Sequence, residues 1–482
     1  MSVRRLAQIV AFLSCVTGAT GLAQQTGAPP QSSRQTTRCT LVPQPTTRFS
    51  TDTIAGGGQV VFVGGGVLIR CPARGITLKG DSAEQYPDRD FMVGHVVYDE
   101  PRFHLTSDYL THFSVEDRIV AVGNVHARLP SGSMLVGPMA EYRREMPRIR
   151  PRKQIIARAR PTITVVEKDS TGKPAPPMTV IADSVFMDGD SLIYGSGQVI
   201  ITRPDIKATA DSAFIDQGKE TMRLWQKPEL VGKKDRQFTL NGKEILLFSK
   251  NRKLQRVLSR EKATAVSDSM TLKSDTIDLR VRNDVLDHAY AWGTSRARAE
   301  SPQQNLTADS LDVQMPNQKI QTVRALRKAF AEARTDTTRF KPEKNDLHDW
   351  LKGDTIVAHF DTTAAPNDTA KGPNIRQLTA TGNARSYYHL APNDSAETRP
   401  AIDYLVARQI TIDFNDQRVA TVTAVDSVSG VYVEPRADTT RTRATTVAGP
   451  GAPLPIPATP PGAPGRSTPG PKSIIPLPPK KP

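Results

Sequence analysis

The sequence has few cysteines and histidines, two residue types that often bind metals or act in catalysis. It has three cysteines and eight histidines in 482 residues, and the histidines lack the spacing of metal ligands. The glycine-rich segments 56–58 and 64–66 are not followed by the lysine and helix of a phosphate-binding loop, and no nucleophile elbow is present. We therefore expect no catalytic residue, no metal and no cofactor, and a protein that is not an enzyme.

Long apolar runs are also missing, since no stretch after residue 23 approaches the roughly twenty apolar residues of a membrane helix. Segment 1–23 has two arginines, an apolar run and small residues ending at Ala23, which is typical of a secretory signal peptide cleaved after Ala23. Phe12-Leu-Ser-Cys15 matches a lipoprotein cleavage box only weakly, because phenylalanine is unusual at its first position. Lipidation of Cys15 is thus the less favoured alternative.

Few cysteines remain after cleavage. If Cys15 leaves with the signal peptide, Cys39 and Cys71 are left as an even pair in an oxidising compartment, which favours a disulfide. The bond would attach an irregular N-terminal segment, 24–48, to the first strands. Two free thiols are the alternative.

The charge is unevenly distributed. Of the net +15, two units belong to segment 1–23 and six to segment 436–482; the remaining seven equal the charge of segment 143–160, with eight basic residues and Glu145. This stretch suits an anionic headgroup, whereas export and the lack of interleaved aromatic residues argue against nucleic acid. A solvated strand face is the alternative. The headgroup candidates are Arg143, Arg144, Arg148, Arg150, Arg152 and Lys153.

What the sequence does contain is one motif in ten copies, of which Asn305-Leu-Thr-Ala-Asp-Ser-Leu-Asp-Val313 is the clearest. Internal repeats of this length are typical of solenoids and arrays. Directly before the Asp309 position, every copy has a small residue: Gly80, Ser107, Gly137, Ala182, Ala210, Gly242, Ser274, Ala308, Gly353 and Ala407.

Apolar residues flank the small residue on both sides. Two positions after the aspartate every copy is apolar, as at Ile277 and Leu311. Three positions before it, nine copies carry a leucine or valine: Leu78, Leu105, Leu135, Val180, Leu240, Leu272, Leu306, Leu351 and Leu405.

The alternation of apolar and polar residues predicts strands with one buried face. The buried parity before the aspartate is opposite to the parity after it, and such a slip exchanges the faces unless a bulge or corner absorbs it. We interpret each copy as one long strand bent at its small residue, where a larger side chain would collide with its neighbour. Return strands carry Gly123, Gly197, Gly293 and Gly382 at the same corner.

The pattern predicts an all-β fold: an elongated β-jellyroll, or β-taco solenoid, of bent antiparallel strands that is open along one side. We divide the repeats into a first part, 49–167, and a second part, 178–435. Whether these parts are one continuous jellyroll or two in tandem is left open by the sequence. Segment 436–482 is rich in proline, threonine and glycine and is predicted to be a disordered tail.

The motif, followed by return strands with an Ala-x-Gly-x-Val pattern, resembles the OstA-like family. This family comprises the periplasmic lipopolysaccharide-transport proteins LptA and LptC and the N-terminal domain of LptD. The resemblance is clearest at 179–201, 207–215 and 271–313. It implies a periplasmic location in a double-membraned bacterium, and a jellyroll that carries acyl chains in its apolar interior and stacks edge to edge on other jellyroll proteins of lipopolysaccharide transport. The chain is about twice as long in strands as one LptA-like domain and lacks the C-terminal barrel of LptD.

On this interpretation the chain is a non-enzymatic bridge that binds and transfers lipopolysaccharide or a similar glycolipid. The groove would be lined by the nine leucine and valine residues of the motif together with Ile277 and Leu311. The alternative is a structural or adaptor solenoid whose interior is filled by its own side chains and whose loops and tail bind envelope partners. An open groove between the walls would favour the lipid bridge, and a core filled by the protein's own side chains would favour the structural or adaptor solenoid.

Overall fold

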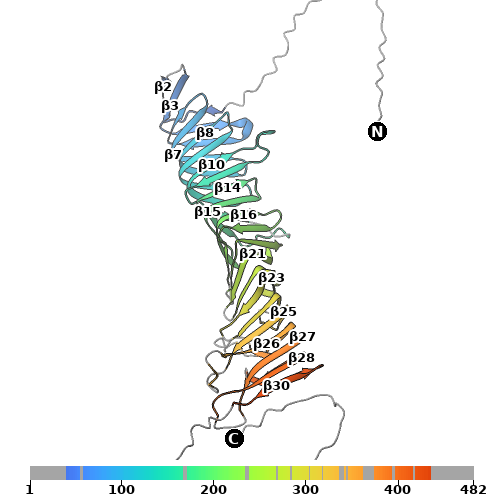
Figure 1. Cartoon of the computed structure of the whole chain (residues 1–482). Coiled ribbons are helices and arrows are strands. Elements are labelled where there is room, and N and C mark those ends of the chain that lie inside the picture. The colour runs from blue at the N-terminus through green and yellow to red at the C-terminus, as the bar shows by residue number, and fades with distance from the viewer. Residues whose placement is uncertain are drawn as a thin grey trace, which may run out of the picture.

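The computed structural model of the chain is a long, twisted stack of strands running from β2 and β3 at one end to β30 at the other (Figure 1). It describes residues 39–435 apart from 55–57, 167–170, 234–237, 268–269, 283–284, 303, 317–318, 336–340, 344–345, 362–373, 393–396 and 416–417. The expected signal peptide and C-terminal tail lie outside the described residues.

The described residues form thirty strands in one antiparallel sheet, with a 3₁₀ turn at Pro72–Arg74. The strands are β1 (Thr40–Leu41), β2 (Arg48–Ile54), β3 (Gly58–Gly64), β4 (Val67–Cys71), β5 (Ile76–Gly80), β6 (Ser82–Gln85), β7 (Arg89–Glu100), β8 (Phe103–Phe113), β9 (Arg118–Arg128), β10 (Met134–Arg143), β11 (Gln154–Arg158), β12 (Thr162–Val165), β13 (Met178–Ile181), β14 (Ser184–Asp188), β15 (Leu192–Thr202), β16 (Ile206–Asp216), β17 (Thr221–Trp225), β18 (Glu229–Gly232), β19 (Phe238–Asn241), β20 (Glu244–Lys250), β21 (Lys253–Ser267), β22 (Thr271–Arg282), β23 (Val285–Glu300), β24 (Gln304–Gln314), β25 (Thr322–Arg334), β26 (His348–Phe360), β27 (Ile375–Leu390), β28 (Ala401–Asn415), β29 (Arg418–Val425) and β30 (Ser429–Val433).

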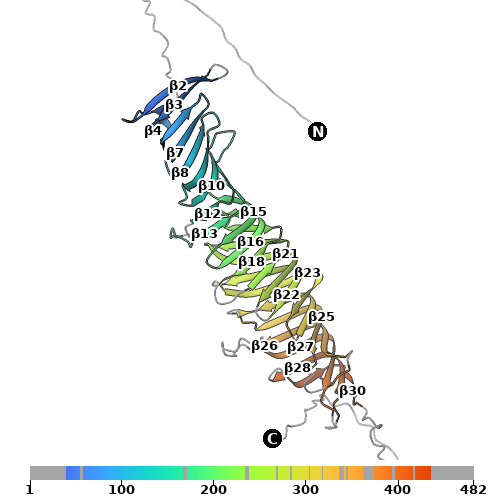
Figure 2. The same ribbon diagram turned by 90° about the vertical axis from the view of Figure 1, so that its left-hand side faces the viewer.

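The sheet is folded lengthwise into two walls that meet at a corner. Wall A contains the half of each repeat that precedes the small residue, and wall B contains the half that follows it. Long strands such as β8 and β22 cross the corner and belong to both walls, and the strands succeed one another along the molecule in both views (Figure 2). This confirms the predicted all-β jellyroll of bent antiparallel strands.

Three copies of the motif differ from the prediction of one unbroken strand. The chain leaves the ladder at Asp81, Ala182–Asp183 and Gly242–Lys243, so that β5 and β6, β13 and β14, and β19 and β20 are separate strands on the two walls. Hydrogen bonding nevertheless continues around the corner: the N–H of Asp183 donates to the carbonyl of Gly197 over 2.8 Å. The bend is sharp enough here to interrupt the strand without leaving the backbone unpaired.

The extra residues that make the corner lie on the return strands. In β9, Gly123 and Asn124 occupy the space opposite the single residue Asp108 of β8, which is a two-residue bulge. Gly123 has a φ of +77° and Asn124 a φ of +42°, and the amide of Asn124 donates to the Asp108 carboxylate over 2.9 Å. The same glycine-to-aspartate contact recurs at Gly94, Gly197, Gly293 and Gly382, where the partners are Asp81, Asp183, Asp275 and Asp354.

The small residues of the motif all lie at this corner, where neighbouring backbone approaches closely. A Cβ added to Gly242 would lie 2.3 Å from the Ser259 hydroxyl and 3.0 Å from the Arg260 carbonyl. At Gly137 the close neighbour is the ring of Pro161. Ala182 and Ala308 are fully buried. A small side chain at these places is thus required by the space available.

The sheet continues across the segment in which a break between two jellyrolls was considered. Strand β12 pairs with β13 from Thr162–Ile181 to Val165–Met178, and β11 pairs with β14 on the other wall. Within the described part of the chain, no helix is long and apolar enough to cross a membrane.

Candidate functional site

A continuous row of uncharged residues lines the inner face of wall A. Each residue of this row is the direct cross-strand partner of the next, so the row passes from edge strand β1 to edge strand β30. At roughly 4.8 Å per strand, it is roughly 100 Å long. Row A consists of Leu41, Ile69, Leu78, Tyr98, Leu105, Ala127, Leu135, Ile163, Val180, Ile201, Ala208, Leu230, Leu240, Ala265, Leu272, Ala299, Leu306, Ala331, Leu351, Ser386, Leu405 and Gly430.

Wall B carries an equivalent row, which begins in edge strand β2 and ends in β29. It also has no charged member. Row B consists of Phe49, Val63, Ala83, Met92, Leu110, Ala121, Ala140, Ala157, Val185, Gly195, Ala213, Leu224, Ile245, Ser259, Ile277, Ala291, Leu311, Ala325, Ile356, Ala380, Ile410 and Ala424.

The structure brings the expected groove residues together in these two rows. The nine leucine and valine residues of the motif are all members of row A, and Ile277 and Leu311 are members of row B. The sequence pattern did not reveal the residues between them, because alanine in a return strand such as Ala299 or Ala325 carries little hydrophobic signal. Those alanines alternate with leucine and isoleucine from β22 onward and make the inner face there shallower.

The interior is closed to water along most of its length. Leu78, Leu135, Val180 and Leu240 have no exposed surface, and they belong to one hydrophobic cluster with the residues of wall B. The side chains of the two walls therefore pack against each other, as they would in a filled core. The packing loosens toward the C-terminal end, where Leu306 and Leu405 are only partly buried.

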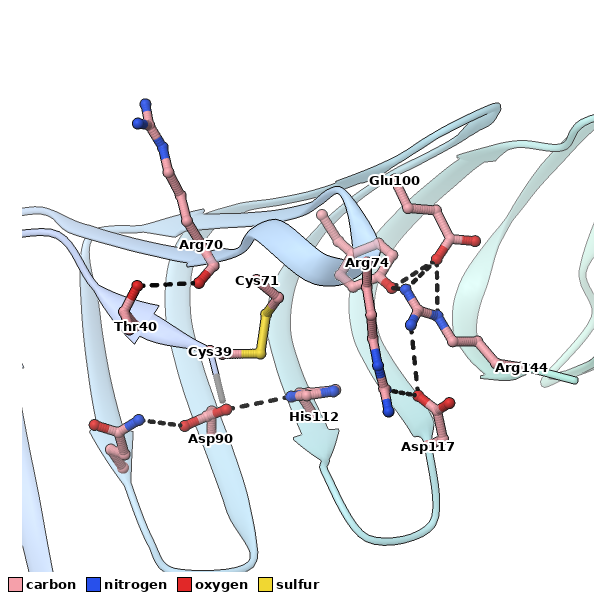
Figure 3. The surroundings of a disulfide bond; sticks show 12 residues. Cys39, Thr40, Arg70, Cys71, Arg74, Asp90, Glu100, His112, Asp117 and Arg144 are labelled. Atoms are coloured by element: carbon pink, nitrogen blue, oxygen red, sulfur yellow. Dashed lines mark hydrogen bonds and ion pairs between the residues drawn. A yellow bond between two sulfur atoms is a disulfide. The ribbon is translucent and has the colours of Figure 1, made fainter. Parts of the chain in front are cut away.

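A polar network holds the two walls together near the N-terminal end (Figure 3). Glu100 lies at the end of β7 on wall A, whereas Arg144 directly follows β10 on wall B. Arg144 donates to the Glu100 carboxylate over 2.8 Å and to the Tyr98 hydroxyl over 2.8 Å, and the Tyr142 hydroxyl donates to Glu100 over 2.6 Å. We call the space between the two walls the trough, and the side opposite the corner, where the rims of the walls face each other, its mouth. The polar network, which we call the latch, bridges this mouth.

A second ion pair joins the same two rims. Arg74 of the 3₁₀ turn donates to Asp117, in the turn between β8 and β9, over 2.7 Å, and Arg144 lies 3.6 Å from the same carboxylate. Burial and the neighbouring Glu100 raise the pKa of both Tyr98 and Tyr142. Both phenols therefore stay protonated at neutral pH and donate to Glu100 rather than repel it.

Farther along the mouth, Arg203 makes another bridge between the rims. This residue follows β15 on wall A, and its guanidinium donates over 3.1 Å to the carbonyl of Arg252, which lies in the turn between β20 and β21 on wall B. It also donates to the Asp205 carboxylate over 3.1 Å. The mouth is thus closed by charged hydrogen bonds at two levels of the N-terminal half.

One polar pair lies inside wall B near the N-terminal end. His112 and Asp90 face each other across β7 and β8 with 3.2 Å between Nδ1 and the carboxylate, and both side chains are almost fully buried. Gln85 donates to the other oxygen of Asp90 over 3.1 Å. The pair is hydrogen-bonded, so it is tolerated beneath the apolar rows.

Most of the basic stretch 143–160 is neutralised by carboxylates that lie outside the stretch. Arg143 pairs with Glu141 over 2.7 Å and Arg144 belongs to the latch. Arg152 and Lys153 pair with Asp188 and Asp190, each over 2.8 Å. Arg150 donates to the carbonyls of Arg144 and Glu116, and Arg148 is exposed. The sequence count, which set these residues against Glu145 alone, overstated the free positive charge.

The two cysteines meet at the N-terminal edge. A disulfide joins Cys39 to Cys71, and β1 pairs with β4 beside it (Figure 3). The segment expected to be irregular therefore contributes a short strand to wall A. The bond fixes β1 beside β4, the next strand of wall A.

No protein-family model matches the sequence, and a comparison with curated proteins gives no significant match. Solved structures do give matches. One is LptH of Pseudomonas aeruginosa, described as the LptA-homologous periplasmic component of the lipopolysaccharide transport device. The alignment covers 26% of this chain and 94% of LptH, with 19% identity and a TM-score of 0.23. A similarity of this extent does not assign a function.

Proposed function

We propose that this protein is a non-enzymatic periplasmic bridge that binds the acyl chains of lipopolysaccharide or a similar glycolipid between its two walls. The observation that carries the proposal is row A, an unbroken line of uncharged side chains from one edge strand to the other. Row B faces it from wall B. A lipid tail is stabilised by burial against such surfaces, and because burial is non-directional the tail can slide along them without a high barrier.

Acyl chains would enter by replacing the contacts between the walls. The C-terminal half is the easier place for this exchange, because Leu306 and Leu405 are already partly exposed and alternate with small residues such as Ala331. The N-terminal half needs the latch and the Arg203 bridge to open. The transfer makes and breaks no covalent bond, and the charged saccharide of the lipid stays outside the mouth.

The ends of the array support stacking on other jellyrolls. Among the described residues, strands β29 and β30 each pair on one side only, with β28, and their backbone donors and acceptors on the other side have no ladder partner there. Val431 and Val433 of β30 are half exposed, as is Phe49 of β2 at the opposite end. Addition of a partner's strand at these edges would extend both rows into the next protein.

Arginine substitution on the inner and outer faces of wall A tests lipid binding. Leu306→Arg places a charge on the inner face of β24, and Thr239→Arg places the same charge on the outer face of β19. With lipopolysaccharide as the probe, we expect Leu306→Arg to weaken binding at least tenfold while circular dichroism stays that of the native sheet, and Thr239→Arg to bind normally. Equal binding by both variants would overturn the proposal.

A structural or adaptor array is the second candidate, and the complete burial of residues such as Leu135 and Leu240 favours it. A filled core cannot accept a charge, because an unpaired buried arginine costs several kcal/mol. If the core is permanently filled, Leu306→Arg unfolds the neighbouring strands instead of only releasing lipid. Circular dichroism of this variant therefore separates the two functions.

A further inference from the structure

The outer face of wall A has a depression of about 500 Å³ beside the corner in the C-terminal part of the molecule. Its size is within the range of small-molecule sites. The depression is lined mainly by cations and aromatic rings that belong to β23, β25, β26 and β27: Arg296, Lys328, Phe330, Trp350, Lys352 and Asn383.

The alternation of the strands aims these side chains outward. Leu351 and Ala331 belong to row A, so their neighbours Trp350, Lys352 and Phe330 lie on the outer face. The rings of Phe330 and Trp350 have centroids 6.2 Å apart, and Trp350 stacks on Tyr387 at 5.9 Å with an angle of 8° between the planes. The stack holds the indole in place, while only part of its surface is buried.

The corner of β23 is enlarged at this depression. Two residues bulge at the corners of β9 and β15, but four, Gly293 to Arg296, separate the paired residues Trp292 and Ala297 in β23. The longer bulge carries Arg296 across β24, where its guanidinium donates to the carbonyls of Thr307 and Lys328. The repeat does not need these two additional residues to turn its corner.

The two lysines of the depression are free of ion pairs within the described part of the chain. Among the described residues, no carboxylate pairs with Lys328 or Lys352, and both side chains are exposed. Asp354 is the one carboxylate in the lining, and it already accepts a hydrogen bond from the Asn383 amide over 3.2 Å. Three cations against one occupied carboxylate leave a local excess of positive charge beside an aromatic surface.

We propose that this depression is a binding site for an anionic saccharide, a phosphorylated or carboxylated sugar. Such a ligand has flat C–H faces that pack on an indole or phenyl ring, hydroxyl groups that bond to an amide such as that of Asn383, and a negative group that the three cations attract. The site lies outside the trough and does not depend on acyl chains entering it.

The repeat supplies a matched control for this site. Leu78-Lys-Gly-Asp81 and Leu351-Lys-Gly-Asp354 are identical segments at equivalent places, and Lys79 is exposed like Lys352. The first copy is preceded by Thr77 and the second by Trp350. Lys79→Glu therefore makes the same charge change on the same wall without the aromatic surface, and Trp350→Thr gives the second copy the residue of the first.

The test is titration of the full chain with the phosphorylated saccharide released from lipopolysaccharide by complete deacylation, followed by tryptophan fluorescence and calorimetry. A charge-assisted hydrogen bond contributes about tenfold or more to binding. We expect Lys352→Glu, Lys328→Glu and Trp350→Thr each to weaken binding by about this factor and Lys79→Glu to leave it unchanged. Soluble peptidoglycan fragments and inorganic phosphate, titrated in parallel, distinguish the source of the anion.

Each binding result either supports or overturns the proposed saccharide site. Preference for the deacylated saccharide assigns the site to a glycolipid headgroup, and preference for the carboxylated fragments assigns it to the cell wall; both support an anionic-saccharide site. Binding that falls equally in Lys79→Glu, or that inorganic phosphate reproduces, shows general attraction to cations and overturns the proposal. Lipid binding by Leu306→Arg is an independent result, so failure of this site and failure of the proposed function are distinguishable.

Discussion

Replacement of Gly123 by alanine should destabilise the corner of the trough for two reasons, an unfavourable backbone conformation and a steric collision. At a φ of +77° an L-residue costs roughly 1–2 kcal/mol. The added Cβ would also lie 2.4 Å from a carboxylate oxygen of Asp108 and 2.9 Å from its Cβ. Overpacking of this kind typically lowers stability by about 1–3 kcal/mol more. We therefore expect a loss of about 2–5 kcal/mol in the local stability of β8 and β9.

Gly132→Ala is the matched control. Gly132 also has a positive φ, of +86°, but a Cβ there meets nothing within 4 Å. This variant should lose only the conformational term of about 1–2 kcal/mol. A double mutant, Asp108→Gly with Gly123→Ala, removes the collision and should recover about 1–3 kcal/mol relative to the sum of the single changes.

Hydrogen exchange of peptides that cover 103–128, measured by mass spectrometry, reports local stability in an array whose repeats open separately. If Gly123→Ala and Gly132→Ala lose the same protection, the aspartate does not limit the space at the corner. The account of why the motif pairs an aspartate with a return-strand glycine would then be wrong.

Three further predictions concern the ends and the mouth of the trough. Arg144→Met leaves the buried carboxylate of the latch unpaired and should cost about 3–5 kcal/mol, seen as faster exchange in β7 and β10. Cys39→Ser opens a loop of 32 residues and should destabilise the N-terminal edge by about 3–4 kcal/mol, measured by urea unfolding. Burial opposes protonation of His389, but its hydrogen bond to Asp349 and the charge of Asp346 dominate and raise its pKa above 6.5. Its contribution is therefore complete below pH 6.5 and lost as pH rises through the folded pKa. The protection factors of residues 346–349, which correct for the base-catalysed intrinsic rate of amide exchange, should thus be lower at pH 8.5 than at pH 5.5, and His389→Gln should abolish this difference.

The motif predicted the bent strands because its signals are local. A small residue before an aspartate, with apolar residues of opposite parity on either side, specifies a corner wherever it occurs, and the motif's own members of row A follow from placing the ten copies in register. The motif also identified the return-strand glycines at Gly123 and Gly382, since a two-residue bulge with positive φ favours glycine at its first position.

Other features could not be predicted because they depend on contacts between distant segments. Glu261 and Lys262, and likewise Arg327 and Lys328, adopt the same left-handed bulge without any glycine or asparagine, since hydrogen bonding around the corner overrides local preference. The latch likewise joins Arg144 to Glu100 across 44 positions of sequence. A linear count of charge cannot reveal such a pair.

The closed interior is the feature that the sequence described least well. Alternating leucines indicate a buried face, but they do not show whether that face meets lipid or the opposite wall. In the structure the buried face packs against the opposite wall along most of the molecule. Lipid binding therefore requires the walls to part, and Leu306, which is only partly buried, is the place to observe it.

Photo-crosslinking in cells tests this claim most directly. A photoreactive phenylalanine at position 306 faces the other wall, and the same group at position 239 of β19 faces outward. The account predicts that mass analysis finds an acylated glycolipid attached at position 306 and none at position 239. Crosslinks from position 306 only to the protein's own wall B would contradict it.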